Sequence, residues 1–357
     1  MISNNELQSK VIAFLRFPLI VGVVFIHTCL TSVNIGGRLF VEEGDFPFHD
    51  IFRYLISEEF ARIAVPLFFF MSGFLFFTHT NFTFSAYKNK LAKRVHTLLI
   101  PYLFWNIVVL ALFFLTQTFV SSMTSGASKL IVDYTISDLL GIFWSQPICY
   151  QFWFIRDLMV VVLFSPFIYF LVKYLKAIGV VMLGILWCFG LWFPLTGFSS
   201  VAFFFFSFGA WFAVHQHNFV ADFKPLRLSF TFLYILIVMA DIILWYKQIE
   251  GFHFIHNIGI LVGLIAIVTW TAYGIQKGKL KCSALLAGSS FFIYAYHGMP
   301  IAFLVKFWVK LTQPATELTM ILGYVLIPFF IVGLGLGVYL LMQKFLPRFT
   351  SFITGRR

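Results

Sequence analysis

Two ionisable side chains, Arg16 and His27, lie on the first apolar stretch of the chain with ten uncharged residues between them. An ionisable residue inside a membrane span is costly and usually marks a pathway or a reaction centre. An offset of eleven residues on an α-helix is about 1100°, or three turns plus about 20°, so both side chains share one face about 16 Å apart. The spacing predicts a row of functional side chains through the bilayer along this face, from a cation near one membrane surface to a titratable imidazole deeper in the span.

Four further polar side chains interrupt apolar stretches downstream. Arg156 and Asp157 are adjacent, and the carboxylate could orient an imidazole or neutralise a cation. Their alternative role is an ion pair that only holds helices together. His297 lies near the middle of a predicted span, and beside Tyr294 it could line the same cavity as His27, or form only a packing hydrogen bond.

Arg16, His27 and a basic run further along the chain also have alternative, non-catalytic roles. Arg16 could extend its guanidinium to the lipid headgroups, and His27 could form only an interhelical hydrogen bond. A basic run that contains Lys90, Lys93 and Arg94 precedes the third apolar stretch. This run favours either a phosphate-binding patch or contact with anionic lipids.

The composition indicates that a membrane surrounds the elements that position these residues. Hydrophobic residues make up 61% of the 357 and charged residues 11%, with a mean hydropathy of +0.93. So few charges could not cover the surface of a soluble domain of this size. The net charge of +11 would indicate a nucleic-acid partner in a soluble protein. Here it is attributed to basic cytoplasmic loops, and no nucleic-acid partner is expected.

Apolar runs predict an all-α polytopic membrane bundle of about ten helices, as one domain over 1–357. With both termini in the cytoplasm, sixteen of the 25 Lys and Arg fall on the inside and seven on the outside, which agrees with the positive-inside rule. The predicted spans are 11–31, 61–79, 96–120, 150–172, 177–194, 199–214, 228–246, 255–275, 285–308 and 318–345.

No metal site is expected from the sequence. The pairs His215/His217 and His253/His256 lie at the ends of predicted spans, without a carboxylate or cysteine set that would converge on them. The chain also contains no Walker-type glycine loop and no dinucleotide-binding fingerprint.

Taken in order along the chain, several stretches resemble the acyltransferase-3 family of integral membrane acyltransferases. The first is the family's Arg-x10-His signature, present as Arg16 and His27, and the others lie downstream over nearly the whole chain. These stretches are 65–75, the basic run leading into 98–106, 153–158 and 290–297. Two departures stand out: Ala13 replaces an acid that members often carry, and Lys90 and Lys93 with Arg94 replace a double arginine, without its bidentate geometry.

The resemblance implies a ten-helix enzyme of a bacterial-type inner membrane that needs no metal. It would transfer an acyl group, most often acetyl, from cytoplasmic acyl-CoA to a hydroxyl of a cell-envelope glycan or another exported acceptor. Lys90, Lys93 and Arg94, with Arg16, would hold the CoA phosphates. His27 would act as general base, oriented or assisted by Arg156, Asp157, Tyr294 or His297.

The sequence leaves two alternatives open. Direct transfer and a covalent relay through a tyrosine or histidine are both compatible with these residues. A transporter or flippase for a lipid-linked glycan could also use buried Arg and His, and it predicts broken helices around a midplane site without thioester consumption.

Overall fold

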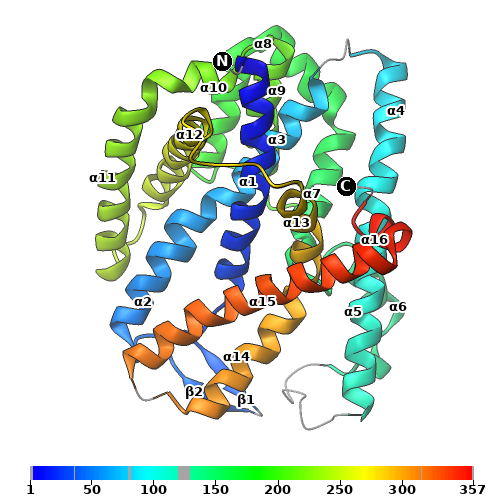
Figure 1. The fold of residues 1–357 in the computed structure, drawn as a ribbon, viewed down its shortest axis with the longest axis vertical. Coiled ribbons are helices and arrows are strands. Elements are labelled where there is room, and N and C mark those ends of the chain that lie inside the picture. The colour runs from blue at the N-terminus through cyan, green and yellow to red at the C-terminus, as the bar shows by residue number, and fades with distance from the viewer. Residues whose placement is uncertain (1–2, 36, 79–81, 120–128, 315, 356–357) are drawn as a thin grey trace.

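The computed structural model describes residues 3–35, 37–78, 82–119, 129–314 and 316–355, and its elements are almost all helices. The first helix, α1 (Asn4–His27), runs through the middle of the molecule with the other helices around it (Figure 1). The hydroxyl of Ser3 accepts a hydrogen bond from the backbone N–H of Glu6 and so caps its start. Because α1 contacts α3, α12, α13 and α15, its side chains reach the centre of the bundle.

The first half of the chain forms two long, interrupted helical runs and a small hairpin between α1 and the first of them. The hairpin is β1 (Val33–Ile35) and β2 (Arg38–Val41), paired antiparallel. The first run is α2 (Pro47–Arg53), η1 (Tyr54–Phe60), η2 (Ala61–Ile63) and α3 (Ala64–Phe77). The second is α4 (Phe84–Arg94), η3 (Val95–Leu99) and α5 (Ile100–Phe119).

The second half adds the helices that surround α1. Short elements come first: η5 (Ile131–Asp133), α6 (Ile136–Phe143), η6 (Tyr150–Phe152) and α7 (Trp153–Leu163). Then follow α8 (Ser165–Cys188), α9 (Ser200–Val214), α10 (Phe219–Phe223), η7 (Lys224–Leu226), α11 (Arg227–Tyr246) and α12 (His253–Gln276). The last are α13 (Ala284–Tyr296), α14 (Gly298–Thr312), α15 (Glu317–Phe345) and α16 (Pro347–Ile353).

The all-α membrane architecture is confirmed, and each predicted span lies mostly on helix, although residues 28–31 and 189–194 are not helical (79 and 120 lie outside the described residues). Within those residues, seven helical segments are long and apolar enough to cross a membrane, or eight if one bent pair counts as a span. The segment α9 is shorter than this test requires, and α8 changes direction at Lys176, where φ is 51°. The number ten and the cytoplasmic termini remain predictions.

Helices α3 and α9 approach so closely that their backbones touch. A Cβ atom added at Gly73 would lie 2.0 Å from the carbonyl oxygen of Phe206, and one added at Gly209 would lie 1.9 Å from that of Phe70. Small residues that let helix backbones meet are a common device in membrane bundles. This close contact between α3 and α9 holds α3 against the core, next to α1.

His297 does not lie within a continuous helix, and that expectation is wrong. The predicted span 285–308 consists of α13 and α14, which meet at His297 with a bend of 67°. Pro300 explains the break, because its ring would clash with the carbonyl of Tyr296 and it has no N–H to donate. The bend places His297 at a junction between two helices.

Candidate functional site

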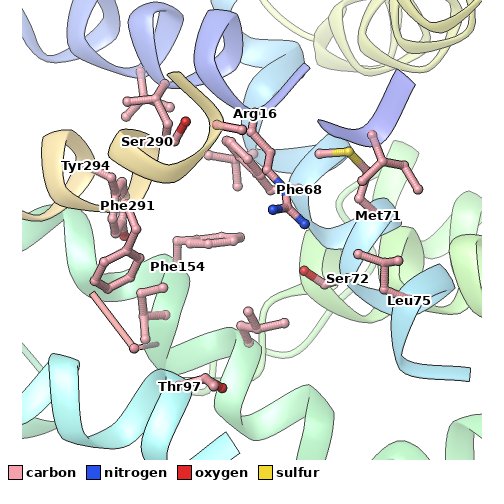
Figure 2. Close-up of a pocket in the computed structure, with 18 of the residues that line it drawn as sticks. Arg16, Phe68, Met71, Ser72, Leu75, Thr97, Phe154, Ser290, Phe291 and Tyr294 are labelled. Carbon is pink, nitrogen blue, oxygen red and sulfur yellow. The ribbon is translucent and has the colours of Figure 1, made fainter. Parts of the chain in front are cut away.

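Arg16 and Arg94 line one cavity of about 310 Å³, here called the arginine cavity. Arg16 comes from the middle of α1 and Arg94 from the end of α4. Figure 2 shows the Arg16 guanidinium pointing into the open space, with the hydroxyl of Ser72 on another side of it. The other polar residues that line the arginine cavity are Thr97, Ser290 and Tyr294, and most of its remaining wall is apolar.

Both arginines are available to a ligand. In the part of the chain that the structure describes, no carboxylate lies within ion-pair distance of either Arg16 or Arg94. Arg94 does lie over the ring of Phe76, with 5.9 Å from its Cζ to the ring centroid. Two guanidinium groups in a mostly apolar pocket make a site suited to an anion with phosphate groups.

The basic run is divided between different environments. Lys90 donates a hydrogen bond to the carbonyl oxygen of Phe76, in the last turn of α3, whereas the side chain of Lys93 is exposed. Arg16 also borders a second, larger cavity of about 820 Å³ between the start of α1 and the end of α9. Among the three basic residues, only Arg94 lines the arginine cavity.

The two histidines predicted as site residues are in contact. The rings of His27 and His297 are stacked, with 5.3 Å between their centroids and 29° between their planes. The ring of Tyr150, at the start of η6, meets His27 edge-on at 4.8 Å. His27 is the last residue of α1, so the end of one helix, a helix junction and a short loop element build this histidine pair.

The hydrogen bonding of His297 defines its tautomer. Its Nδ1 lies 3.2 Å from the carbonyl oxygen of Ile293, which can only accept, so Nδ1 carries the hydrogen. Its Nε2 is buried and has no hydrogen-bond partner among the described residues. A neutral His297 therefore presents an unshared lone pair inside the bundle, beside the ring of His27.

His27 opens on the other side to a separate cavity of about 290 Å³, here called the histidine cavity. Its lining includes Tyr150 and Lys306, together with residues of β1 and α14. The site thus has the arginine cavity at one end and the histidine cavity at the other. His27 borders the histidine cavity and does not border the arginine cavity.

Tyr294 connects the two ends. It lines the arginine cavity, and its ring centroid lies 6.0 Å from that of His297. Its hydroxyl donates a 2.6 Å hydrogen bond to the backbone carbonyl of Gln151, which fixes the ring. Tyr294, His297 and His27 therefore form a continuous row of side chains between the arginine cavity and the histidine cavity.

Arg156 and Asp157 contact each other and neither histidine. The Arg156 Nη2 lies 2.8 Å from Oδ1 of Asp157, and its Nη1 donates to the carbonyl oxygen of Trp144 at 2.9 Å. Both side chains are buried. The pair joins α7 to the loop that follows α6.

Sequence reasoning missed Tyr150, Ser72 and Gln151 as lining or supporting residues. Tyr150 and Gln151 lie at the boundary of a predicted span, where a residue pattern does not tell which side chain turns inward. Sequence reasoning also missed that Glu59 and Asp241 converge on His256, because the three residues come from different helices. The expectation that no carboxylates approach His256 is wrong.

Comparisons with known proteins identify the family of the chain. A family model described as an acyltransferase domain matches residues 11–342, which include every site residue named above. The succinoglycan biosynthesis protein ExoH of Rhizobium meliloti (strain 1021) is 26% identical over 97% of this chain and 92% of its own length. No solved structure matches the chain significantly. Because the family model covers nearly the whole chain, this protein belongs to the acyltransferase-3 family of membrane acyltransferases.

Proposed function

We propose that the protein transfers an acyl group, acetyl in the simplest case, from cytoplasmic acyl-CoA to a hydroxyl of a cell-envelope polysaccharide. One observation carries the proposal: a row of Tyr294, His297 and His27 joins a cavity lined by two arginines to a second cavity. The name of the related succinoglycan biosynthesis protein supports a polysaccharide as the acceptor.

The arginine cavity is the proposed donor site. Arg16 and Arg94 would bind CoA phosphates, and Lys90 and Lys93, on the same helix as Arg94, would add positive charge. The mostly apolar wall suits the pantetheine arm, which would extend along the Arg16–His27 face of α1. This assignment places the arginine cavity toward the cytoplasm, as the charge bias of the loops predicts.

The histidine pair is the proposed reaction centre. The acceptor would enter the histidine cavity and give its hydroxyl proton to His27, while its oxygen attacks the thioester carbonyl. The C–S bond then breaks, and the CoA thiolate leaves and takes up the proton. The ring of His297 stacks on the His27 ring and would hold it in position, which makes His297 a positioning residue.

The proposal is tested with purified protein in proteoliposomes, supplied with radiolabelled acetyl-CoA and a polysaccharide from a deletion strain. The variant His27→Ala should lose transfer by several orders of magnitude, whereas the matched control His253→Ala, an exposed histidine at the start of α12, should keep it. Full transfer by a folded His27→Ala variant would refute the role of the imidazole.

One observation favours the transporter as a second candidate. The bend between α13 and α14 beside a buried histidine has the form of the broken helices that line transport sites. A transporter would move a lipid-linked glycan without consuming thioester. Release of free CoA, measured with a thiol reagent, therefore separates the two functions in one assay.

A further inference from the structure

Three ionisable side chains meet at a second place in the molecule, away from the two cavities described above. Glu59 comes from η1, Asp241 from the end of α11 and His256 from the first turn of α12. One ligand atom from each lies within 4.8 Å of the others. The Nδ1 of His256 lies 2.9 Å from Oδ2 of Asp241 and 3.9 Å from Oε1 of Glu59.

These separations are close to those of a metal site. Zinc binds histidine nitrogen and carboxylate oxygen at about 2.0–2.2 Å in a tetrahedral arrangement, which places ligand atoms about 3.3 Å apart. The separations of 2.9 and 3.9 Å fall on either side of this value, so small side-chain rotations would complete the site. One imidazole with two carboxylates suits zinc and its first-row neighbours, because calcium and magnesium prefer oxygen ligands.

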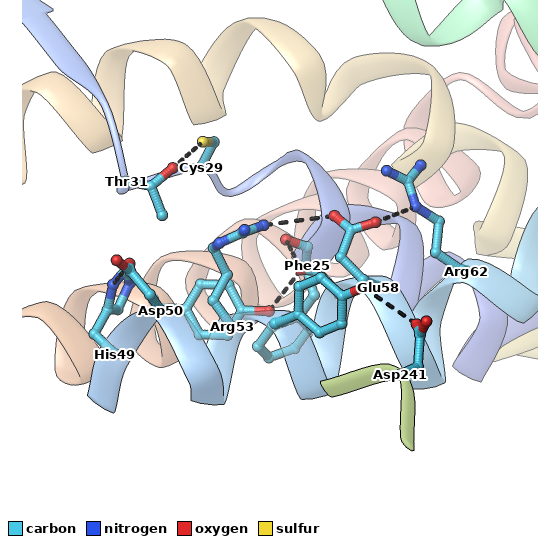
Figure 3. Close-up of polar contacts among 12 residues, drawn as sticks. Phe25, Cys29, Thr31, His49, Asp50, Arg53, Glu58, Arg62 and Asp241 are labelled. Atoms are coloured by element: carbon cyan, nitrogen blue, oxygen red, sulfur yellow. Dashed lines mark hydrogen bonds and ion pairs between the residues drawn. The ribbon is translucent and has the colours of Figure 1, made fainter. Parts of the chain in front are cut away.

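The charges of the cluster also favour a cation. The side chain of Glu59 is only 2% exposed, and its Oε1 faces His256 with no hydrogen-bond partner among the described residues. The nearby Arg53 and Arg62 both pair with Glu58, as Figure 3 shows, and neither pairs with Glu59 or Asp241. A divalent ion would neutralise both carboxylates and leave the imidazole neutral.

The surrounding groups hold the ligands in place, as outer groups do in metal sites. The hydroxyl of Tyr54 donates to Oδ2 of Asp241 at 3.1 Å, and its ring stacks on Trp245 with 4.3 Å between centroids. The hydroxyl of Tyr234 donates to the backbone carbonyl of Glu59. Such second contacts orient ligands and contribute to affinity.

We propose that Glu59, Asp241 and His256 bind a divalent transition-metal ion of the zinc type, with water as the fourth ligand. The ion fastens η1 to α11 and α12. The same turn contacts α1, since Ser57 donates a hydrogen bond to the carbonyl oxygen of Phe25, two residues before His27. The site lies apart from the arginine cavity and the histidine cavity, and it does not depend on the proposed acyl transfer.

The test is metal binding by the protein purified in detergent with an affinity tag that contains no histidine. After treatment with EDTA and dialysis, Zn²⁺ is added and the retained zinc is counted by mass spectrometry. Co²⁺ is added separately, and its visible absorption reports a tetrahedral site with nitrogen and oxygen ligands. The wild type should retain one equivalent of zinc and show a higher midpoint of thermal unfolding with it.

The variants locate the ion. Glu59→Gln, Asp241→Asn and His256→Ala should each lose the retained zinc, and Tyr54→Phe should weaken affinity about 10- to 100-fold. The control His253→Ala, an exposed histidine one turn earlier on α12, should bind as the wild type does. If the wild type retains no zinc and no cobalt, the proposal is overturned without recourse to any variant. Equal retention by the wild type and a folded Glu59→Gln or His256→Ala variant would overturn it as well.

Discussion

Replacing Arg94 with alanine should weaken CoA binding far more than replacing its neighbour Lys93. Arg94 lines the arginine cavity and has no carboxylate partner among the described residues, so its guanidinium is free to contact a phosphate. A hydrogen bond to a charged group contributes about 1.5–3 kcal/mol. The dissociation constant of CoA should therefore rise about 10- to 100-fold in Arg94→Ala, at 1.4 kcal/mol for each factor of ten.

Lys93 provides the matched control. Its side chain is exposed, and exposed charge pairs contribute about 0–1 kcal/mol. Lys93→Ala should therefore weaken binding less than about fivefold, and added salt should abolish most of that difference. Arg94→Lys should recover part of the affinity, because lysine keeps the charge without the bidentate geometry.

Isothermal titration of CoA into the protein in detergent, at low and at high salt, measures all three variants. Arg16 remains in the cavity of Arg94→Ala, so binding should be weakened and not abolished. If Lys93→Ala weakened binding as much as Arg94→Ala, the general charge of the α4 surface would be responsible. The assignment of the arginine cavity to the donor would then be refuted.

Three other predictions test the surrounding structure. Arg156→Ala should destabilise the fold by about 3–5 kcal/mol, because it leaves Asp157 buried without its cation. Thermal unfolding followed by tryptophan fluorescence measures this loss. A large loss of activity at unchanged stability would argue for a catalytic role instead. Gly209→Ala should separate α3 from α9 and lower the free energy of unfolding by about 1–3 kcal/mol in the same assay. The control is Gly333→Ala, which should be neutral because a Cβ there meets nothing within 4 Å. Tyr150→Phe should keep most of the acyl-transfer activity and Tyr150→Ala should lower it, because the ring edge contacts His27; equal activity in both variants would show that this contact is dispensable.

Much of the helical framework could be predicted, because apolar length is a strong signal. Each predicted span lies mostly on helix, and the shared face of Arg16 and His27 follows from the helical period. The sequence did not predict where an apolar stretch is interrupted by a bend. An apolar window treats 285–308 as one helix, although Gly298 and Pro300 mark a break, and a Cβ at Gly298 would lie 2.6 Å from Oε1 of Gln151.

The contacts between elements could not be read from the sequence in the same way. Glu59 and Asp241 are far apart in the chain, and only the packing of η1 against α11 brings them to His256. Arg156 and Asp157 are adjacent on α7, where neighbouring side chains point in different directions, so their adjacency does not by itself predict the ion pair that they form. Tertiary convergence depends on how helices pack, and a single sequence contains little information on that.

The histidine pair shows what the helical period can and cannot determine. The period places Arg16 and His27 on one face, but His27 is the last residue of α1 and His297 occupies a bend. Both histidines lie at helix ends that meet one another, where their rings stack and His27 still borders the histidine cavity. The bend at Pro300 is therefore a condition for the site, because a straight helix over 285–308 would carry its second half away from His27.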